Sequence, residues 1–338
     1  MILVTGGTGF LGQYLIRALS HTALPVRVLS RNPTKHTHQA SERVEVVAGD
    51  VTDPPSLARA LDGVTHVVHA AALMSFWRKR RDEMFAINVQ GTRNLVSACA
   101  ERRVEKFVYV GAMATMGDPV EQGAALVNEE TPMRLPSPLT SYAETKALAE
   151  QLVLEAARNG LPAVLAIPPL IVGAGNWQEG SCALFKMVHD GFKFYMDGTV
   201  GTVAARDVAQ AVRLLLMSPF HSGERFFLVS EMLSMKELFA QIARSVGKPA
   251  PALKLPTPML RATGSLLETL ASFSGKEPLI SRDAVITMTA APLHRFDASK
   301  ITQLCDFCYA PIADAIAETG AQFLKELQTK GRSNGTRP

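Results

Sequence analysis

The first twelve residues, MILVTGGTGFLG, constrain the fold of this chain more than any other stretch. Ile2–Val4 is a short apolar run typical of a buried strand, and turn residues follow it. Glycines then recur at Gly6, Gly9 and Gly12, overlapping the start of an amphipathic segment. Such glycines let the chain turn sharply, let amides approach a pyrophosphate and let the helix pack closely. The triplet between a strand and a helix therefore predicts a dinucleotide-binding turn, whose helix directs its amides and positive dipole end at phosphates.

Strand and helix patterns alternate through the first half of the chain. Further strands are expected at 25–29, 44–48, 64–69, 106–111 and 163–168, and helices at 54–61, 84–101 and 141–159. This alternation predicts an α/β fold with a doubly wound parallel sheet of the Rossmann type, in which ligands bind outside the carboxyl ends of the strands.

The alternation lapses after residue 175, which predicts two domains. We expect a dinucleotide-binding domain over residues 1–175, to which 206–230 return. Residues 176–205 and 231–329 would form a smaller C-terminal substrate lobe, with a disordered tail over 330–338.

Composition excludes several classes of function. Of the 338 residues, 47% are hydrophobic and 20% charged, as in ordinary globular proteins. The net charge of +4 is not accompanied by any nucleic-acid-recognition motif, so no nucleic-acid partner is predicted. An immediate strand argues against a signal peptide, and no apolar run reaches about 18 residues, so we expect a cytoplasmic protein without a transmembrane segment. Cys305 and Cys308 form a single CxxC that lacks the about two further ligands zinc needs, so no metal site is predicted.

The strand at 25–29 ends in Ser30 and Arg31, with no acidic residue nearby. Enzymes that use NAD usually place an acidic residue here for the ribose hydroxyls, whereas an arginine suits the 2′-phosphate of NADP. Arg31 therefore favours NADP over NAD, and the alternative is an ordinary solvated loop arginine.

Tyr142 and Lys146 are four residues apart in the helix expected at 141–159, so they share one face. A nearby ammonium stabilises a phenolate and lowers the pKa of the phenol from about 10. Tyr142 would then act as general acid or base on a carbonyl or carbinol. Because any helix can carry this pair by chance, it has weight only together with the glycine turn.

With the glycine triplet, Asp50-Val51, His69-Ala70-Ala71, Asn88 and the Tyr142/Lys146 pair in this order, the chain resembles the extended short-chain dehydrogenase/reductase family. It is most similar to the branch of 3β-hydroxysteroid dehydrogenases, dihydroflavonol reductases and related NAD-dependent epimerases and dehydratases. The resemblance implies an NAD(P)-dependent oxidoreductase.

The resemblance also implies three sets of cofactor contacts. The pyrophosphate would be bound by Gly6, Gly9, Phe10, Leu11 and Gly12. The adenosine end would meet Arg31, Asp50 and Val51. The nicotinamide end would be lined by Ala70, Ala71 and Asn88, or these residues would hold the strand ends at that place. The nicotinamide would also lie against Pro169, Leu170 and Ile171. Tyr142 would be the acid/base, and Lys146 would bind the nicotinamide ribose while lowering the pKa of Tyr142.

One departure from the family pattern concerns catalysis. The family usually has two hydroxyl residues after the strand at 106–111, and the second polarises the substrate oxygen; here Gly111 and Ala112 occupy these positions. Our hypothesis is that Thr115 substitutes as the donor, leaving a slow enzyme. The alternative is that Thr115 is a turn residue bonded to its own backbone. Ser75 and a bound water are weaker candidates.

The leading functional hypothesis is transfer of a hydride to or from an apolar secondary alcohol or ketone, with NADP preferred. A nucleotide-sugar epimerase or dehydratase is an alternative, although the apolar segment at 259–273 argues against a polar substrate lobe. A dinucleotide-binding protein with little or no turnover is a third hypothesis, favoured by the missing serine.

The segment 259–273 could shape a pocket or contact a membrane surface, and plain packing is its default explanation. The basic run 76–81 is expected to be a solvated face or, alternatively, a rim for an anionic part of the substrate. A small-molecule substrate and a homodimer are compatible with the sequence.

Overall fold

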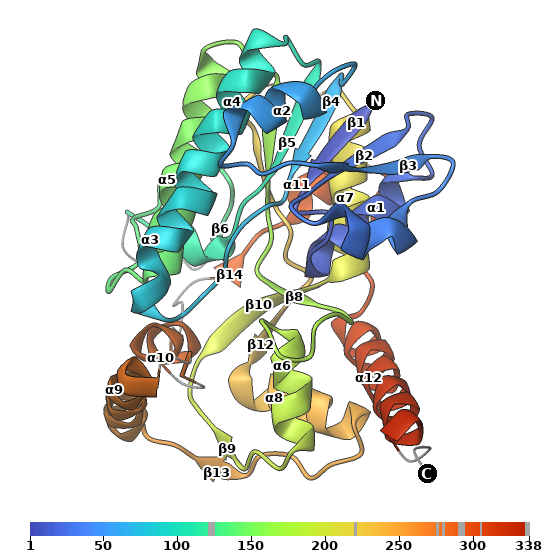
Figure 1. The fold of residues 1–338 in the computed structure, drawn as a ribbon. Helices are drawn as coiled ribbons and strands as arrows, with labels where there is room; N and C mark the ends of the chain where they lie inside the picture. Colours follow the sequence, from blue (N-terminus) through green and yellow to red (C-terminus); the bar gives the residue numbers. More distant parts are fainter. Residues whose placement is uncertain are drawn as a thin grey trace. The chain divides into compact units, whose positions relative to one another are not determined.

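The computed structural model describes residues 1–120, 126–219, 222–274, 277–278, 281–289, 295–304 and 306–334. The chain forms two compact units (Figure 1). The first comprises Met1–Pro169, Arg206–Leu228 and Leu293–Phe307. The second comprises Leu170–Ala205, Val229–Pro292 and Cys308–Pro338.

The first unit is built on a parallel sheet that has seven strands within the described residues. These strands are β1 (Ile2–Thr5), β2 (Val26–Ser30), β3 (Val44–Ala48), β4 (His66–His69), β5 (Lys106–Val110), β7 (Ala163–Ile167) and β11 (Arg225–Phe227). Their order is β11-β7-β5-β4-β1-β2-β3, and neighbouring strands run parallel. The order reverses between β1 and β4, which is where doubly wound sheets bind their ligands. The predicted fold class is confirmed.

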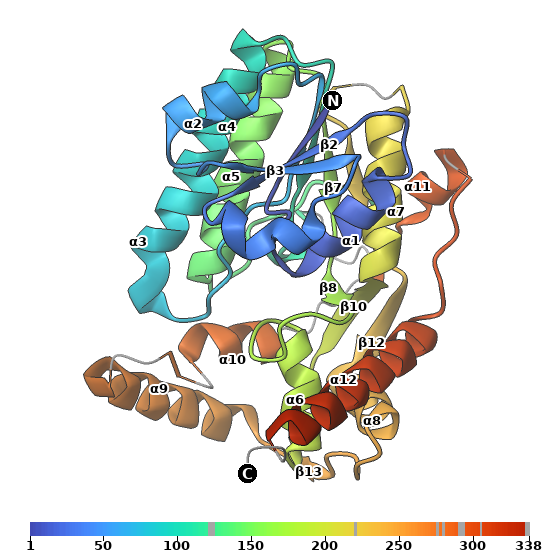
Figure 2. The same cartoon turned by 45° about the vertical axis from the view of Figure 1, so that its right-hand side comes forward.

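Helices cover both faces of this sheet, which explains why its central strands are continuous apolar runs. Every residue of β5 and β7 is buried. Figures 1 and 2 show α1 (Phe10–Leu19) and α7 (Ala205–Met217) on one side of the sheet. The other side carries α2 (Pro54–Ala60), α3 (Arg81–Met84), α4 (Gly91–Glu101) and α5 (Ser141–Arg158).

The helix expected over 84–101 is interrupted. The π-helical segment η3 (Phe85–Gln90) separates α3 from α4 and contains Asn88. Such π-turns frequently occur at functional sites because they rotate a side chain out of the regular helical register.

The second unit contains a three-stranded sheet of β8 (Leu170–Val172), β10 (Thr199–Ala204) and β12 (Glu231–Ser234) among its described residues. Its helices are α6 (Cys182–His189), α8 (Met235–Ser245), α9 (Thr257–Ser274), α10 (Arg282–Thr289) and α12 (Ile312–Asn334). Two short strands, β9 (Phe194–Tyr195) and β13 (Leu253–Lys254), also pair with each other. A reciprocal capping box of Ser234 and Glu237 determines where α8 begins.

Three expected boundaries differ in the structure. The second unit begins at Leu170 rather than at 176, because β8 pairs with β10. Leu293–Phe307 belongs to the first unit, because β14 (Arg295–Phe296) pairs with β6 (Leu126–Val127) and α11 (Ser299–Leu304) contacts β11. The tail predicted over 330–338 is helical as far as Asn334, and 335–338 lie outside the described residues.

The apolar segment at 259–273 lies within α9 and leaves one helical face uncovered. Met259, Leu266, Leu270 and Phe273 recur at helical spacing and are 59%, 61%, 55% and 86% exposed. None of the helices in the described part of the chain is long and apolar enough to cross a membrane. Of the CxxC cysteines, Cys308 is exposed and free, and Cys305 lies outside the described residues.

Candidate active site

The glycine turn joins β1 to α1 and packs against the end of β4. Gly6 has a φ of 72°, and a Cβ there would lie 2.6 Å from the carbonyl carbon of Ala70. A Cβ at Gly12 would lie 2.2 Å from the Gly6 carbonyl oxygen and 2.4 Å from the Gly7 carbonyl carbon. These contacts are between backbones and cannot be relieved by rotating a side chain. Glycine is therefore required at both positions for the helix to approach the turn.

The N-terminus of α1 is open to an anion. No side chain caps it, and its first turn carries no acidic residue. The first-turn amides of a helix have no intrahelical acceptors, and the helix dipole adds positive potential there. Gly9, the N-cap residue, is exposed. The uncapped end suits the pyrophosphate of a dinucleotide, and contacts of Phe10, Leu11 and Gly12 with it stay a prediction. A contact from the Gly9 amide also stays a prediction, and without ligand this amide donates to the Gly6 carbonyl at 3.0 Å.

The residues expected at the adenosine end follow β2 and β3. Arg31 is exposed. The pKa of Glu83 is lowered chiefly by its hydrogen bond with Arg80, and the charge of Arg31 lowers it slightly further. Asp50 accepts hydrogen bonds at 2.8 Å from the backbone amide and the hydroxyl of Thr52, so its carboxylate stiffens the turn after β3. Val51 follows as a buried side chain.

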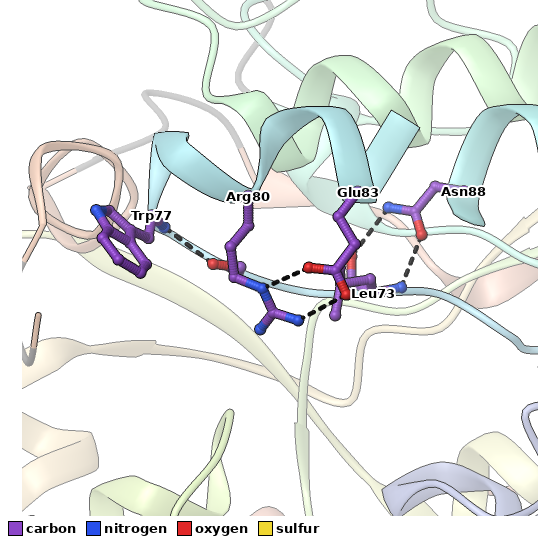
Figure 3. A network of polar contacts seen from close by, with 6 residues as sticks. Leu73, Trp77, Arg80, Glu83 and Asn88 are labelled. Carbon is purple, nitrogen blue, oxygen red and sulfur yellow. Dashed lines mark hydrogen bonds and ion pairs between the residues drawn. The ribbon is translucent and has the colours of Figure 1, made fainter. Parts of the chain in front are cut away.

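Asn88 clamps the segment after β4 to the helix that carries the acid/base pair. Its Oδ1 accepts from the Leu73 amide at 2.7 Å, and its Nδ2 donates to the Leu73 carbonyl at 2.9 Å (Figure 3). The same Nδ2 donates to Thr145 Oγ1 at 3.0 Å. Asn88 is only 1% exposed. Of the two roles left open for it, the geometry supports holding the strand end.

A directed chain of hydrogen bonds continues from Asn88 into the sheet. Thr92 Oγ1 donates to the Asn88 carbonyl at 2.5 Å, so it accepts from Nε2 of His69 at 2.9 Å. Nδ1 of His69 then accepts from Thr5 Oγ1 at 2.6 Å, and Thr5 Oγ1 accepts from the Ala71 amide at 3.3 Å. We assign this tautomer from the network. Burial lowers the pKa of His69 to about 3, so the imidazole stays neutral and holds the Ala70–Ala71 segment in place.

The basic run at 76–81 is partly neutralised by neighbouring carboxylates. Arg80 Nε pairs with Glu83 at 2.8 Å, as Figure 3 shows, and Arg81 Nη2 pairs with Glu144 at 2.8 Å. Trp77 is buried rather than presented at a rim. These pairs favour the solvated-face interpretation over an anion-attracting rim.

Tyr142 and Lys146 are presented by the first turns of α5. Thr140 caps this helix by accepting from the Ala143 amide at 3.2 Å. Lys146 is 3% exposed, and its Nζ donates to the Val110 carbonyl at 2.8 Å, at the carboxyl end of β5. Tyr142 is half-buried, one helical turn earlier on the same face. The pair therefore lies where ligands of doubly wound sheets bind.

Burial dominates the titration of both groups. It lowers the pKa of Lys146 to about 7, against an opposing effect of Glu150. It raises the pKa of Tyr142 to about 12. The expected lowering of the Tyr142 pKa by Lys146 is therefore wrong for this chain. The physical reason is that burial of the phenol raises its pKa and outweighs the support from Lys146, which is itself close to half neutral at pH 7 and directs its Nζ at a backbone carbonyl.

The structure also contradicts the proposed role of Thr115. Its hydroxyl donates to the Ala112 carbonyl at 3.0 Å, and the residue is 5% exposed. This is the turn-residue alternative, so Thr115 does not offer its proton to a substrate. Ser75 is 3% exposed, and its Oγ accepts from the Trp77 amide at 3.0 Å.

The residues expected against the nicotinamide belong to different units. Pro169 ends the first segment of the first unit, whereas Ile171 lies in β8 opposite Val203 of β10. The Ile171 carbonyl accepts from Ser181 Oγ at 2.5 Å, which secures β8 to the segment before α6. A contact of Pro169 and Ile171 with the nicotinamide stays a prediction.

Sequence reasoning missed the buried Tyr109 and Glu150 and the half-buried Arg225, which lies 3.7 Å from Glu150. Glu150 is 6% exposed and lies one turn beyond Lys146 on α5, and this spacing was a usable signal. Arg225 lies on β11, 75 positions further along the chain, and nothing local pointed to it.

The sequence profile described as the NAD dependent epimerase/dehydratase family matches residues 2–226. The chain therefore belongs to this family, and it is an NAD(P)-dependent oxidoreductase of the extended short-chain dehydrogenase/reductase type.

Among its relatives, "Sterol demethylase protein B" of Methylococcus capsulatus is 31% identical over 79% of this chain and 81% of its own length. The "2-alkyl-3-oxoalkanoate reductase" of Shewanella oneidensis is 27% identical over 95% and 84%, respectively. The solved structure titled "Crystal structure of gox2253" is 30% identical, covers 96% of this chain and 98% of its own, and superposes with a TM-score of 0.80.

Proposed function

We propose that this protein transfers a hydride between NADP(H) and an apolar secondary alcohol or ketone. The observation that carries the proposal is the Tyr142–Lys146 pair at the carboxyl end of β5, together with the open, uncapped N-terminus of α1.

The bound nicotinamide would supply or accept the hydride, and the chain's own residues would manage the proton. Tyr142 donates the proton of its phenol to the ketone oxygen in reduction and takes it back in oxidation. Burial raises the pKa of Tyr142 to about 12, so the phenol is protonated at neutral pH, the state that reduction needs. Lys146 binds the ribose and supports the phenolate as it forms.

The absence of a hydroxyl at Ala112 bears on the rate. Negative charge develops on the substrate oxygen during reduction, and one well-placed donor is worth about 2.7–4 kcal/mol in such sites. Ala112 has no side-chain donor, and the hydroxyl of Thr115 is bonded to a backbone carbonyl. A water as second donor, or a slow turnover, follows from this arrangement.

The preference for NADP rests on Arg31. Its side chain is exposed at the end of β2, where the 2′-phosphate of an adenosine would lie in this fold. The substrate class is suggested by the names of two relatives, a sterol demethylase protein and a 2-alkyl-3-oxoalkanoate reductase. Peripheral membrane contact through the exposed face of α9 and a homodimer stay predictions.

The test is a substrate panel with the purified protein. NADPH and NADH are each offered with sterol ketones, 2-alkyl-3-oxoacids, flavanones and UDP-sugars, and oxidation of the cofactor is followed at its absorbance. We expect turnover with apolar ketones and none in Tyr142→Phe, which keeps the ring and removes the proton. Conversion of UDP-sugars alone would favour the epimerase alternative; it is followed by chromatography of the products, because an epimerase returns the hydride to the sugar and leaves the cofactor absorbance unchanged. Tight cofactor binding without turnover of any substrate would favour the binding-protein alternative.

A further inference from the structure

A buried carboxylate lies behind Lys146. Glu150 is 6% exposed and stands four residues after Lys146 on α5, so the two side chains share one face of the helix. Glu150 Oε1 is 3.7 Å from Arg225 Nη1, whereas Oε2 is buried with no hydrogen-bond partner in the described part of the chain. A buried carboxylate with a spare oxygen is costly unless a further charge compensates it.

Arg225 is held in place from two sides. Its Nη2 donates to the Glu129 carbonyl at 2.7 Å, and its own carbonyl accepts from Lys300 Nζ at 3.2 Å. Glu129 in turn accepts the Phe227 amide at 2.7 Å. The guanidinium that meets Glu150 is therefore a fixed cation, supplied by β11 next to β7 at the edge of the sheet.

The other titratable groups around Lys146 carry no charge at neutral pH. Its Nζ lies 4.4 Å from the ring centroid of Tyr109 on β5. Burial, with smaller effects of Glu150 and Tyr142, raises the pKa of Tyr109 well above its ordinary value. His69 on β4 is neutral, as is Tyr142 on α5. Glu150 is thus the acidic group that opposes the loss of charge from Lys146 among the described residues.

We propose that Glu150 is a positioning residue for the reaction: its buried carboxylate, oriented by Arg225, opposes the loss of charge from the Lys146 side chain at the end of β5. The proposal rests on the role of Lys146 in the proposed function.

The charge matters because a buried ammonium without a nearby anion loses its proton. A neutral Lys146 would still reach the Val110 carbonyl. It would, however, give up one of three N–H donors and all of the electrostatic support that it offers to a phenolate at Tyr142. Removing the Glu150 charge should therefore move the titration of Lys146 without removing its side chain from the site.

The experiment follows Lys146 directly, in the protein without cofactor or substrate. Lysine labelled with carbon-13 at Cε is incorporated, the Lys146 resonance is assigned by its loss in Lys146→Met, and its shift is followed from pH 5 to 10. Wild type is compared with Glu150→Gln, Glu150→Asp and the control Glu155→Gln, whose carboxylate is exposed on the same helix. Thermal unfolding shows that each variant is folded.

We expect the Lys146 midpoint to fall by about one pH unit or more in Glu150→Gln. It should fall less in Glu150→Asp, which keeps the charge one methylene further away, and stay unchanged in Glu155→Gln. With an active substrate, the alkaline limb of the kcat profile should shift by the same amount while KM at low pH is unchanged. If Glu150→Gln folds and its Lys146 midpoint equals that of wild type, the proposal is overturned. If only Glu150→Asp folds, a wild-type Lys146 midpoint in that variant overturns it. Because the titration needs no turnover, failure of the proposed activity would be seen separately.

Discussion

Gly12→Ala is the substitution whose consequence can be worked out most directly from the structure. The added methyl carbon would lie 2.2 Å from the Gly6 carbonyl oxygen and 2.4 Å from the Gly7 carbonyl carbon. Atoms at van der Waals contact are about 3.5 Å apart, so α1 has to retreat from the turn by about 1 Å. Such overpacking costs about 1–3 kcal/mol of folding stability.

The same retreat moves the amides that we expect to bind the pyrophosphate. One hydrogen bond to a charged group is worth about 1.5–3 kcal/mol, which corresponds to a loss of about tenfold to a hundredfold in cofactor affinity. The assay is a fluorescence titration with NADPH, run beside urea unfolding of the same variant.

Gly63→Ala is the matched control. Gly63 has a φ of 69°, and a Cβ there would meet no atom within 4 Å, so alanine brings backbone strain without a clash. The cost of that strain is about 1–2 kcal/mol, and it falls at the N-terminal end of β4, away from the carboxyl ends of the strands. We expect both variants to lose stability and Gly12→Ala alone to lose cofactor affinity. Wild-type affinity in Gly12→Ala, or an equal loss in Gly63→Ala, would refute the reasoning.

Four further predictions follow from the site. Tyr142→Phe should keep NADPH affinity and lose turnover, because only the proton donor is removed; normal turnover would disprove the acid/base role. Arg31→Ala should reduce NADPH affinity by about tenfold or more while leaving NADH unchanged, as titrations with both cofactors will report. Ala112→Ser should raise kcat by adding the missing donor, and a lower kcat would mean that the substrate oxygen lies elsewhere. Burial lowers the pKa of His69 from 6.5 to about 3 in the folded chain. Below pH 6.5 the unfolded chain therefore binds a proton that the folded chain does not, and the stability falls as the pH drops. Between pH 7.5 and 5 this loss is about 2 kcal/mol in urea unfolding, and it should be absent from His69→Gln.

Local patterns were enough to predict the sheet and the cofactor turn. β1 and the glycine turn follow from a branched apolar run and three glycines, because backbone sterics act over a few residues. The spacing of Tyr142 and Lys146 placed them on one helical face, and α5 carries them so. The break in the helix at η3 was not foreseeable from periodicity, and neither were the contacts that Asn88 within it makes with the distant Leu73 and Thr145.

The sequence by itself determined the class of fold, the family and the residue types available for chemistry. Only the tertiary structure decided which of these residues are charged and what they touch. Lys146 and Tyr142 titrate as they do because packing removes water from both. Thr115 turns to a backbone carbonyl, and Glu150 meets an arginine from a strand 75 positions away. Desolvation and long-range pairing depend on segments that are distant in the chain, and so no local pattern can encode them.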